Sequence, residues 1–283
     1  MTAKLDTTHH DRNVVGMTYV YPVVSRRSGG VSVGINLNVN NACNWRCIYC
    51  QVPELKRGSP PPVDLARLED ELHRMLDAIV HGDFMASSVP EGMRRLNDIA
   101  LSGNGEPTSS AEFPAVLDIV SRQLEKFGLV GQIKVVLITN GSLTHRPYVQ
   151  AGLAQLGKIG GEVWFKLDRA TADGLNRINQ TETTPEKVMR NLSICANLCP
   201  TWIQSCVFAL DRLPPGETEI EAYLAFLNQA LASGVPLSGV LLYGLARAST
   251  QPEAPHLSPL PDDWLASLAG RIRLTGLLVQ VFP

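Results

Sequence analysis

The sequence has few charged residues, almost no net charge and no long apolar run. Only 18% of its 283 residues are charged and 45% are hydrophobic, a balance typical of a folded globular protein rather than a disordered one. The net charge of −2 and the pI near 6.3 do not indicate a strongly basic nucleic-acid binder, although they are compatible with a local basic patch. No apolar run reaches the roughly 18 residues that a membrane span needs, so no membrane association is expected.

Secretion signals and paired metal-binding histidines are also missing. The N-terminal residues MTAKLDTTHHDRN are polar and lack the apolar core of a secretion signal, so we expect a cytoplasmic, reducing location. The six histidines show no metal-ligand spacing apart from the adjacent His9 and His10. In a reducing compartment the six cysteines are expected to be metal ligands or buried thiols rather than disulfides.

Short β-branched runs alternate with amphipathic segments along the chain. Strands are expected at 31–39, 97–103, 133–140, 162–168, 202–210 and 238–246, with a further apolar run at 277–282. Helices are expected at 64–80, 113–127, 146–156, from Thr184 and Pro185 onward, 217–232 and 261–274. Six strand–helix units in a row predict an α/β fold with a parallel sheet and right-handed crossovers. Residues 1–30 are expected to form an N-terminal extension and 31–283 one domain, with irregular structure at 1–30, 82–96 and 250–261.

Two of these strands are polar along one face, which is unusual for a parallel sheet covered on both sides. Either strand alone could be an edge strand facing solvent. Because the pattern occurs twice and reaches the carboxyl ends of the strands, it favours a polar cavity inside the sheet. The polar positions are Asn36, Asn38 and Asn40 in the first strand, and Glu162, Trp164, Lys166 and Asp168 in the fourth.

Three cysteines lie within eight residues in NACNWRCIYCQ, directly after the first expected strand. A redox dithiol would use Cys47 and Cys50 and leave Cys43 unexplained. A structural zinc site usually needs four ligands in two separated pairs, and no second pair with that spacing follows. An iron–sulfur cluster is held by thiolates and suits a compact loop. With three protein ligands it would keep one iron open, so the spacing favours the cluster over the other two sites.

The segment CNWRCIYC resembles the C-x3-C-x2-C signature of the radical S-adenosylmethionine (SAM) superfamily, including the aromatic Tyr49 before the last cysteine. The resemblance extends over roughly residues 31–282. It implies a partial (β/α)6 barrel in which Cys43, Cys47 and Cys50 hold a [4Fe–4S] cluster. It also implies that SAM binds the open iron and is reductively cleaved to a 5′-deoxyadenosyl radical, which abstracts hydrogen from a substrate.

Further segments resemble SAM-binding positions of this family, and each follows the carboxyl end of an expected strand, where barrel enzymes build their sites. The segment SGNGEPT resembles the family's glycine-rich segment for the SAM amino group, and ITNG a position near the ribose or the methionine. Lys166 is expected to pair with the SAM carboxylate, and Asp168 with a ribose hydroxyl or with Lys166. The resemblance thus implies SAM contacts at Tyr49, Gly103, Asn104, Gly105, Glu106, Asn140, Lys166, Asp168, Ser205, Tyr243 and Gly244.

Several of these positions have simpler interpretations. A Gly-rich turn or an Asn-Gly pair is commonly only a turn, and Lys166 with Asp168 could be a structural ion pair. Cys195, Cys199 and Cys206 are expected to be structural. Thr184 and Pro185 begin a helix on which Cys195 and Cys199 continue an apolar stripe.

The motif combination is most similar to the subgroup that includes the tRNA wyosine-base synthases. This chain has no cysteine before Cys43 for a second cluster, and its charge does not indicate an RNA substrate. We therefore expect a radical SAM oxidoreductase or transferase of unidentified substrate, which takes electrons from a reductant such as flavodoxin or ferredoxin. The alternative is a non-catalytic iron–sulfur protein that acts in electron transfer or sensing.

Overall fold

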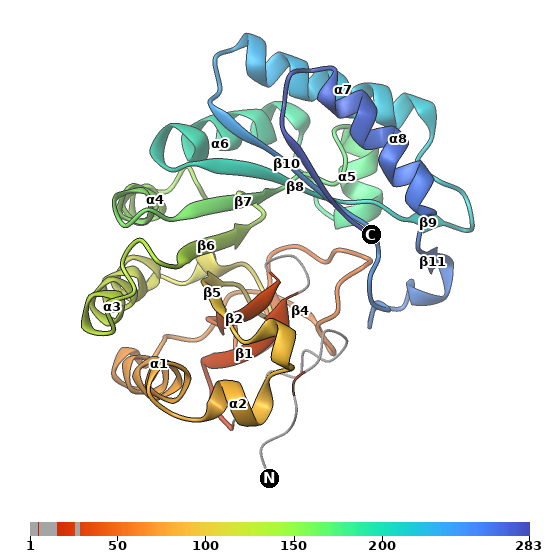
Figure 1. The fold of residues 1–283 in the computed structure, drawn as a ribbon. Helices are drawn as coiled ribbons and strands as arrows, with labels where there is room; N and C mark the ends of the chain where they lie inside the picture. The colour runs from red at the N-terminus through yellow and green to blue at the C-terminus, as the bar shows by residue number, and fades with distance from the viewer. Residues whose placement is uncertain (1–4, 6–15, 26–28) are drawn as a thin grey trace.

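A curled sheet of eight strands forms the centre of the computed structural model, which describes residues 5, 16–25 and 29–283 (Figure 1). β1 pairs antiparallel with β2, and every other neighbouring pair is parallel. β1 and β12 lie at opposite edges, so the sheet stays open and forms a half-barrel, as predicted. In spatial order the strands are β1 (Val20–Ser25), β2 (Gly30–Ile35), β5 (Leu96–Leu101), β6 (Lys134–Thr139), β7 (Glu162–Lys166), β8 (Thr201–Cys206), β10 (Leu237–Tyr243) and β12 (Val279–Phe282).

Helices cover the outer, convex side of this sheet (Figure 1). The longer ones follow the strands in the expected alternation, and α6 begins as predicted, with the Thr184 hydroxyl accepting a hydrogen bond from the Lys187 amide. None of the helices among the described residues is both long and apolar enough to cross a bilayer. The helices are α1 (Leu65–Val80), α2 (Phe84–Ser88), α3 (Phe113–Lys126), α4 (Pro147–Lys158), α5 (Ala172–Asn179), α6 (Pro185–Leu198), α7 (Glu217–Ala232) and α8 (Asp262–Arg273).

The main core lies between the outer face of the sheet and these helices. Val33, Ile99, Leu137, Phe165 and Ile203 are completely buried there, one from each of five neighbouring strands. Burial of such side chains contributes roughly 1.5–3 kcal/mol each and drives the helices onto this face. The polar side chains of the strands consequently lie on the inner face, and the cavity lies on that face.

Three expectations about irregular segments are wrong. Residues 1–30 were expected to lack regular structure, but they contain β1, whose backbone pairs with β2 over its full length. The segment 82–96 contains the short helix α2, and 250–261 contains the two-residue strand β11 (Leu257–Ser258). In addition, α5 follows β7 where no helix was expected. β1 alternates weakly and contains Pro22, and α2 and α5 are only five and eight residues long, shorter than the stretch of about 11–18 residues over which a helical period is read. His9 and His10 lie outside the described residues.

Glu71 on α1 anchors the start of β1. Its buried carboxylate accepts hydrogen bonds from the backbone amides of Thr18, Tyr19 and Val20, at 2.7 Å from Tyr19, and from the Arg67 guanidinium at 2.9 Å. Burial by itself would raise the pKa of Glu71, but these donors outweigh it and lower the pKa below the usual 4.5.

We expect Glu71→Gln to lower the free energy of unfolding by about 1–3 kcal/mol at pH 7. The folded-state pKa is the lower one, so this contribution is complete above the unfolded-state pKa and is lost as the pH falls through the folded-state pKa. Urea titrations at pH 7 and in the acid range should therefore show the difference from wild type shrinking on acidification. Asp70→Asn, on the exposed side of α1, should change stability by less than about 0.5 kcal/mol. A pH-independent difference would contradict this account.

Candidate active site

A cavity of about 1010 Å³ opens at the carboxyl ends of the parallel strands, on the inner side of the sheet. Its wall includes residues from the ends of β2, β5, β6, β7 and β10 and from the cysteine loop. The polar cavity predicted from the two alternating strands is therefore present. The predicted site residues that line it are Cys43, Cys47, Tyr49, Cys50, Gly103, Asn104, Gly105, Glu106, Asn140, Lys166, Tyr243 and Gly244.

The three cysteines face this cavity from one loop. Burial raises the pKa of Cys43 to about 12 and that of Cys47 to about 11, and the neighbouring Cys50 sulfur contributes to both rises. A thiolate is the form that binds metal, so a bound cation must supply the energy of deprotonation here. Within the described part of the chain, no three His, Cys, Asp or Glu side chains are grouped tightly enough to hold one metal ion. Three thiols on one loop fit an iron–sulfur cluster, which is held by thiolates, and they are one ligand short of a structural zinc site.

The carboxyl end of α5 holds the cysteine loop. The carbonyl of Ile178 accepts the amide of Ile48 at 2.9 Å, and that of Asn179 accepts the amide of Arg46 at 3.3 Å. These are carbonyls of the last helical turn, which lack partners inside a helix. The two bonds flank Cys47 on either side and place its sulfur.

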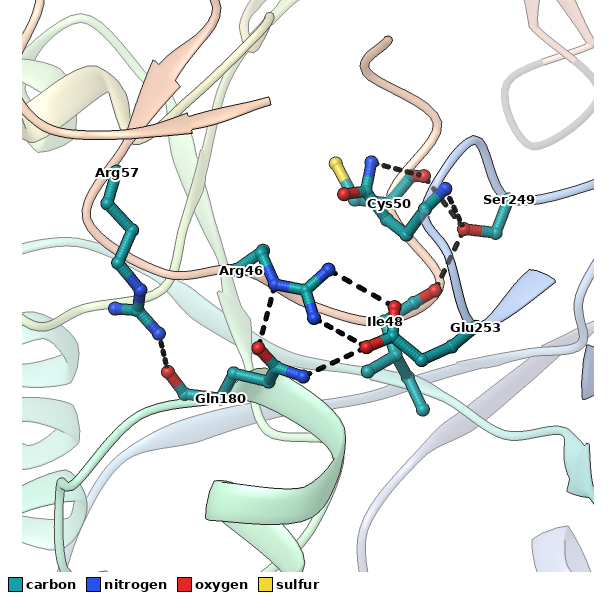
Figure 2. A network of polar contacts seen from close by, with 8 residues as sticks. Arg46, Ile48, Cys50, Arg57, Gln180, Ser249 and Glu253 are labelled. Atoms are coloured by element: carbon teal, nitrogen blue, oxygen red, sulfur yellow. Dashed lines mark hydrogen bonds and ion pairs between the residues drawn. The ribbon is translucent and has the colours of Figure 1, made fainter. Parts of the chain in front are cut away.

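Side chains continue this contact beyond the helix (Figure 2). Arg46 donates to the Gln180 side chain at 2.7 Å and forms a two-point ion pair with Glu253, one contact of which is 3.1 Å. Gln180 also donates to Glu253 at 3.1 Å, and Arg57 donates to the Gln180 carbonyl. The segment after β10 is thereby joined to the cysteine loop and to α5.

A second set of contacts from the same segment secures the last cysteine. The Ser249 hydroxyl donates to the carbonyls of Ile48 and Cys50 at 2.8 and 3.0 Å (Figure 2). The Thr250 amide also donates to the Cys50 carbonyl, at 3.0 Å. Gln251 donates to the carbonyl of Val52 at 2.9 Å. These residues follow the strand expected at 238–246 and reach into the irregular segment expected at 250–261, and the sequence predicted no contact between them and the cysteine loop.

Gly103 and Gly105 lie where no side chain would fit. A Cβ on Gly105 would come within 2.1 Å of the Ala42 carbonyl oxygen, and one on Gly103 within 2.3 Å of Asn36 Oδ1. The Asn104 amide donates to that same Asn36 oxygen at 3.0 Å. The glycine segment is thus more than a turn, because it brings bare backbone against the cysteine loop and the end of β2.

Glu106 joins the ends of β5 and β6. Its buried carboxylate accepts from the Thr108 amide and hydroxyl, the Thr139 hydroxyl at 2.6 Å and the Asn140 amide at 2.7 Å. Burial raises its pKa, and these hydrogen bonds lower it only in part. With its oxygens engaged in this way, Glu106 shapes the glycine segment and orients Asn140 at the cavity wall.

Asp168 does not line the cavity, so its expected contact with a ribose hydroxyl has no support. It lies behind Tyr49, where its carboxylate accepts from the Tyr49 hydroxyl at 2.6 Å, the Asn179 side chain at 2.7 Å and the Cys206 amide at 2.9 Å. The other expected role, a direct ion pair with Lys166, is not seen among the described residues either, and the Asp168 carboxylate acts on Lys166 only through its charge. Burial would lower the pKa of Lys166, but Tyr243 and Asp168 outweigh it and raise this pKa above its usual value. The Lys166 ammonium lies 5.0 Å from the Tyr49 ring centroid.

Ser205 is placed on the wrong face by the sequence prediction. Side chains alternate along a strand, and in β8 it is Gln204 and Cys206 that line the cavity. The Ser205 hydroxyl instead donates to the Leu167 carbonyl at 2.7 Å and lies 2.7 Å from the Tyr223 hydroxyl, on the helix side. Gln204, which pairs in register with Lys166, holds the inward position.

Cys195, Cys199 and Cys206 are separated by the sheet. Cys195 lies on α6 and Cys199 caps its end, and both belong to the main core. Cys206 lies on the cavity side, in a small apolar cluster with Ile48, Tyr49 and Phe208. The structural role predicted for the first two agrees with this placement.

Two curated relatives match this chain at low sequence identity. The chain is 23% identical over 225 residues to a UPF0026 protein of Helicobacter pylori strain 26695, covering 77% of this chain and 65% of that protein. A second UPF0026 protein, from H. pylori strain J99, is 27% identical over 164 residues, 56% of this chain and 45% of that protein. The chain thus spans less than two thirds of the length of either relative.

Solved structures share the fold at low identity. A radical SAM methyltransferase from Sphaerobacter thermophilus superposes with a TM-score of 0.57 at 13% identity, over 93% of this chain and 69% of that one. HydG, a maturase of the [FeFe]-hydrogenase, gives 0.55 at 12% identity, over 88% and 51%. The family model of the radical SAM superfamily matches residues 37–227, more than half of the sequence. This chain therefore belongs to the radical SAM superfamily.

Proposed function

We propose that Cys43, Cys47 and Cys50 hold the cluster of a radical SAM enzyme and that SAM binds in the adjoining cavity. Members of this family use a [4Fe–4S] cluster and SAM. The observation that carries the proposal is the convergence of the cysteine loop and several strand ends on one cavity of about 1010 Å³. This volume is at the upper end of the range for small-molecule sites, roughly 300–1,000 Å³, which leaves room for SAM and a substrate beside the cluster.

The residues around the cavity suit the parts of SAM. When bound, the reduced cluster supplies the electron that cleaves SAM to methionine and a 5′-deoxyadenosyl radical. The backbone of Gly103 and Gly105 lines the cavity beside the cysteine loop, where it would contact the amino group, and the Lys166 ammonium attracts the carboxylate. Tyr243 and Gly244 line the part of the cavity wall on which adenine would pack. The enclosing wall excludes water from the reacting atoms.

The radical chemistry proposed here is that of an oxidoreductase or of a transferase. The motifs resemble the wyosine-synthase subgroup, while the curated relatives carry only the designation UPF0026. An external one-electron donor such as flavodoxin or ferredoxin would reduce the cluster.

The test is reductive cleavage of SAM by the anaerobically reconstituted protein. With dithionite as reductant, we expect 5′-deoxyadenosine and methionine, measured by chromatography. Gly105→Ala should lower the rate about tenfold or more, since an overlap at 2.1 Å must shift backbone and cost more than roughly 1.4 kcal/mol. Gly92→Ala, where a Cβ meets nothing within 4 Å, is the matched control. No cleavage by a protein with an intact cluster would favour an electron-transfer or sensing protein instead.

A further inference from the structure

Asn179 contacts the cysteine loop more closely than any motif indicates. It is the last residue of α5 and is completely buried. Its side-chain amide donates to Cys47 Sγ at 3.2 Å and to Asp168 Oδ2 at 2.7 Å. These contacts span 132 and 11 residues of sequence, so one amide nitrogen links a cysteine of the proposed cluster site to the carboxylate behind it.

The orientation of this amide is fixed by its surroundings. Turned over, the Asn179 amide would point its oxygen at the carboxylate of Asp168, an acceptor facing an acceptor. Asp168 is itself held by the Tyr49 hydroxyl at 2.6 Å and the Cys206 amide at 2.9 Å. The Asn179 oxygen, buried in its turn, has no hydrogen-bond partner among the residues described. The donor therefore points at Cys47, and the backbone bonds of Ile48 and Arg46 to α5 keep the sulfur beside it.

An N–H donor on a cluster sulfur has a defined electrostatic effect. The sulfurs carry more negative charge in the reduced cluster, so the hydrogen bond stabilises the reduced form more than the oxidised form. Hydrogen bonds to the sulfurs are among the factors that set iron–sulfur reduction potentials. Asn179 is well placed for this role, since its donor is buried away from competing water.

We propose that Asn179 raises the reduction potential of the cluster by donating an N–H···S hydrogen bond to Cys47, with Asp168 and Tyr49 orienting the donor. Asn179 is thus a positioning residue that eases transfer of one electron from the external donor to the cluster. The inference rests on the proposed cluster site, and the iron content of wild-type protein tests that site separately.

The test is an EPR-monitored redox titration of anaerobically reconstituted Asn179→Leu, which keeps the bulk of the side chain and removes its donor. We expect a midpoint potential more negative than that of wild type, at unchanged iron content. Asn176→Leu, on the exposed side of α5, is the matched control and should titrate like wild type. Coinciding midpoints for the Asn179 variant and wild type would overturn the proposal.

A second variant controls for poor packing of the leucine side chain at position 179. Asn179→Ala removes the donor without adding a branched side chain and should show the same negative shift. Loss of iron from both variants, with the fold retained by circular dichroism, would assign Asn179 to cluster retention and overturn the tuning role. Wild-type protein without iron would instead contradict the proposed function.

Discussion

Replacing Cys43, Cys47 and Cys50 together by alanine should remove all cluster iron and the near-visible absorbance from anaerobically reconstituted protein. Alanine provides no thiolate, and the nearest other cysteine on the cavity side, Cys206, is held within an apolar cluster. Iron analysis and absorbance spectra measure the loss directly.

The matched control is Cys195→Ala with Cys199→Ala, which changes two buried thiols on the helix side of the sheet. This variant should keep about four irons per chain, the content of one [4Fe–4S] cluster, although each lost sulfur lowers stability. About four irons per chain in the variant without Cys43, Cys47 and Cys50 would show that Cys195, Cys199 and Cys206 bind a cluster. Zinc in place of iron in wild-type protein would contradict the cluster assignment itself.

Asp168→Ala should lower the free energy of unfolding of the apoprotein by about 3–5 kcal/mol, because each buried donor left without an acceptor costs roughly 1–3 kcal/mol. The substitution leaves the Tyr49 hydroxyl, the Asn179 amide and the Cys206 amide without their common acceptor. It also removes the negative charge that helps to keep Lys166 protonated in a buried position. Urea denaturation followed by circular dichroism gives the free-energy difference.

Asp173→Ala is the control for this substitution, since Asp173 is exposed in the first turn of α5. We expect a change of less than about 1 kcal/mol there, from the lost interaction with the helix dipole. If Asp168→Ala were equally mild, the carboxylate would not organise the wall behind Tyr49. The argument that Asp168 orients the Asn179 amide would then fail as well.

The sequence by itself determined the features that depend on local spacing. The interval between Cys43, Cys47 and Cys50 defines a compact thiolate loop wherever that loop lies. The alternating strand at Lys166 predicted an inward polar face, because side-chain direction repeats every two residues. Thr184 and Pro185 predicted the start of α6 from cap chemistry alone. Since parallel strands align their carboxyl ends, the strand-end motifs were bound to meet at one edge.

Only the tertiary structure decided how these parts are held together. Asn179 meets Cys47 across 132 residues and Arg46 meets Glu253 across 207, and no local pattern encodes such a pairing. In β8 the side chain of Gln204 faces the cavity and that of Ser205 faces the helices. The register of β8 with β7 sets these directions. The helix α5 is only eight residues long, too short to be predicted from its periodicity, yet the carbonyls of its last turn hold the cysteine loop. Contacts of this kind depend on where the folded chain brings distant residues, because their stabilisation exists only once the sheet has formed.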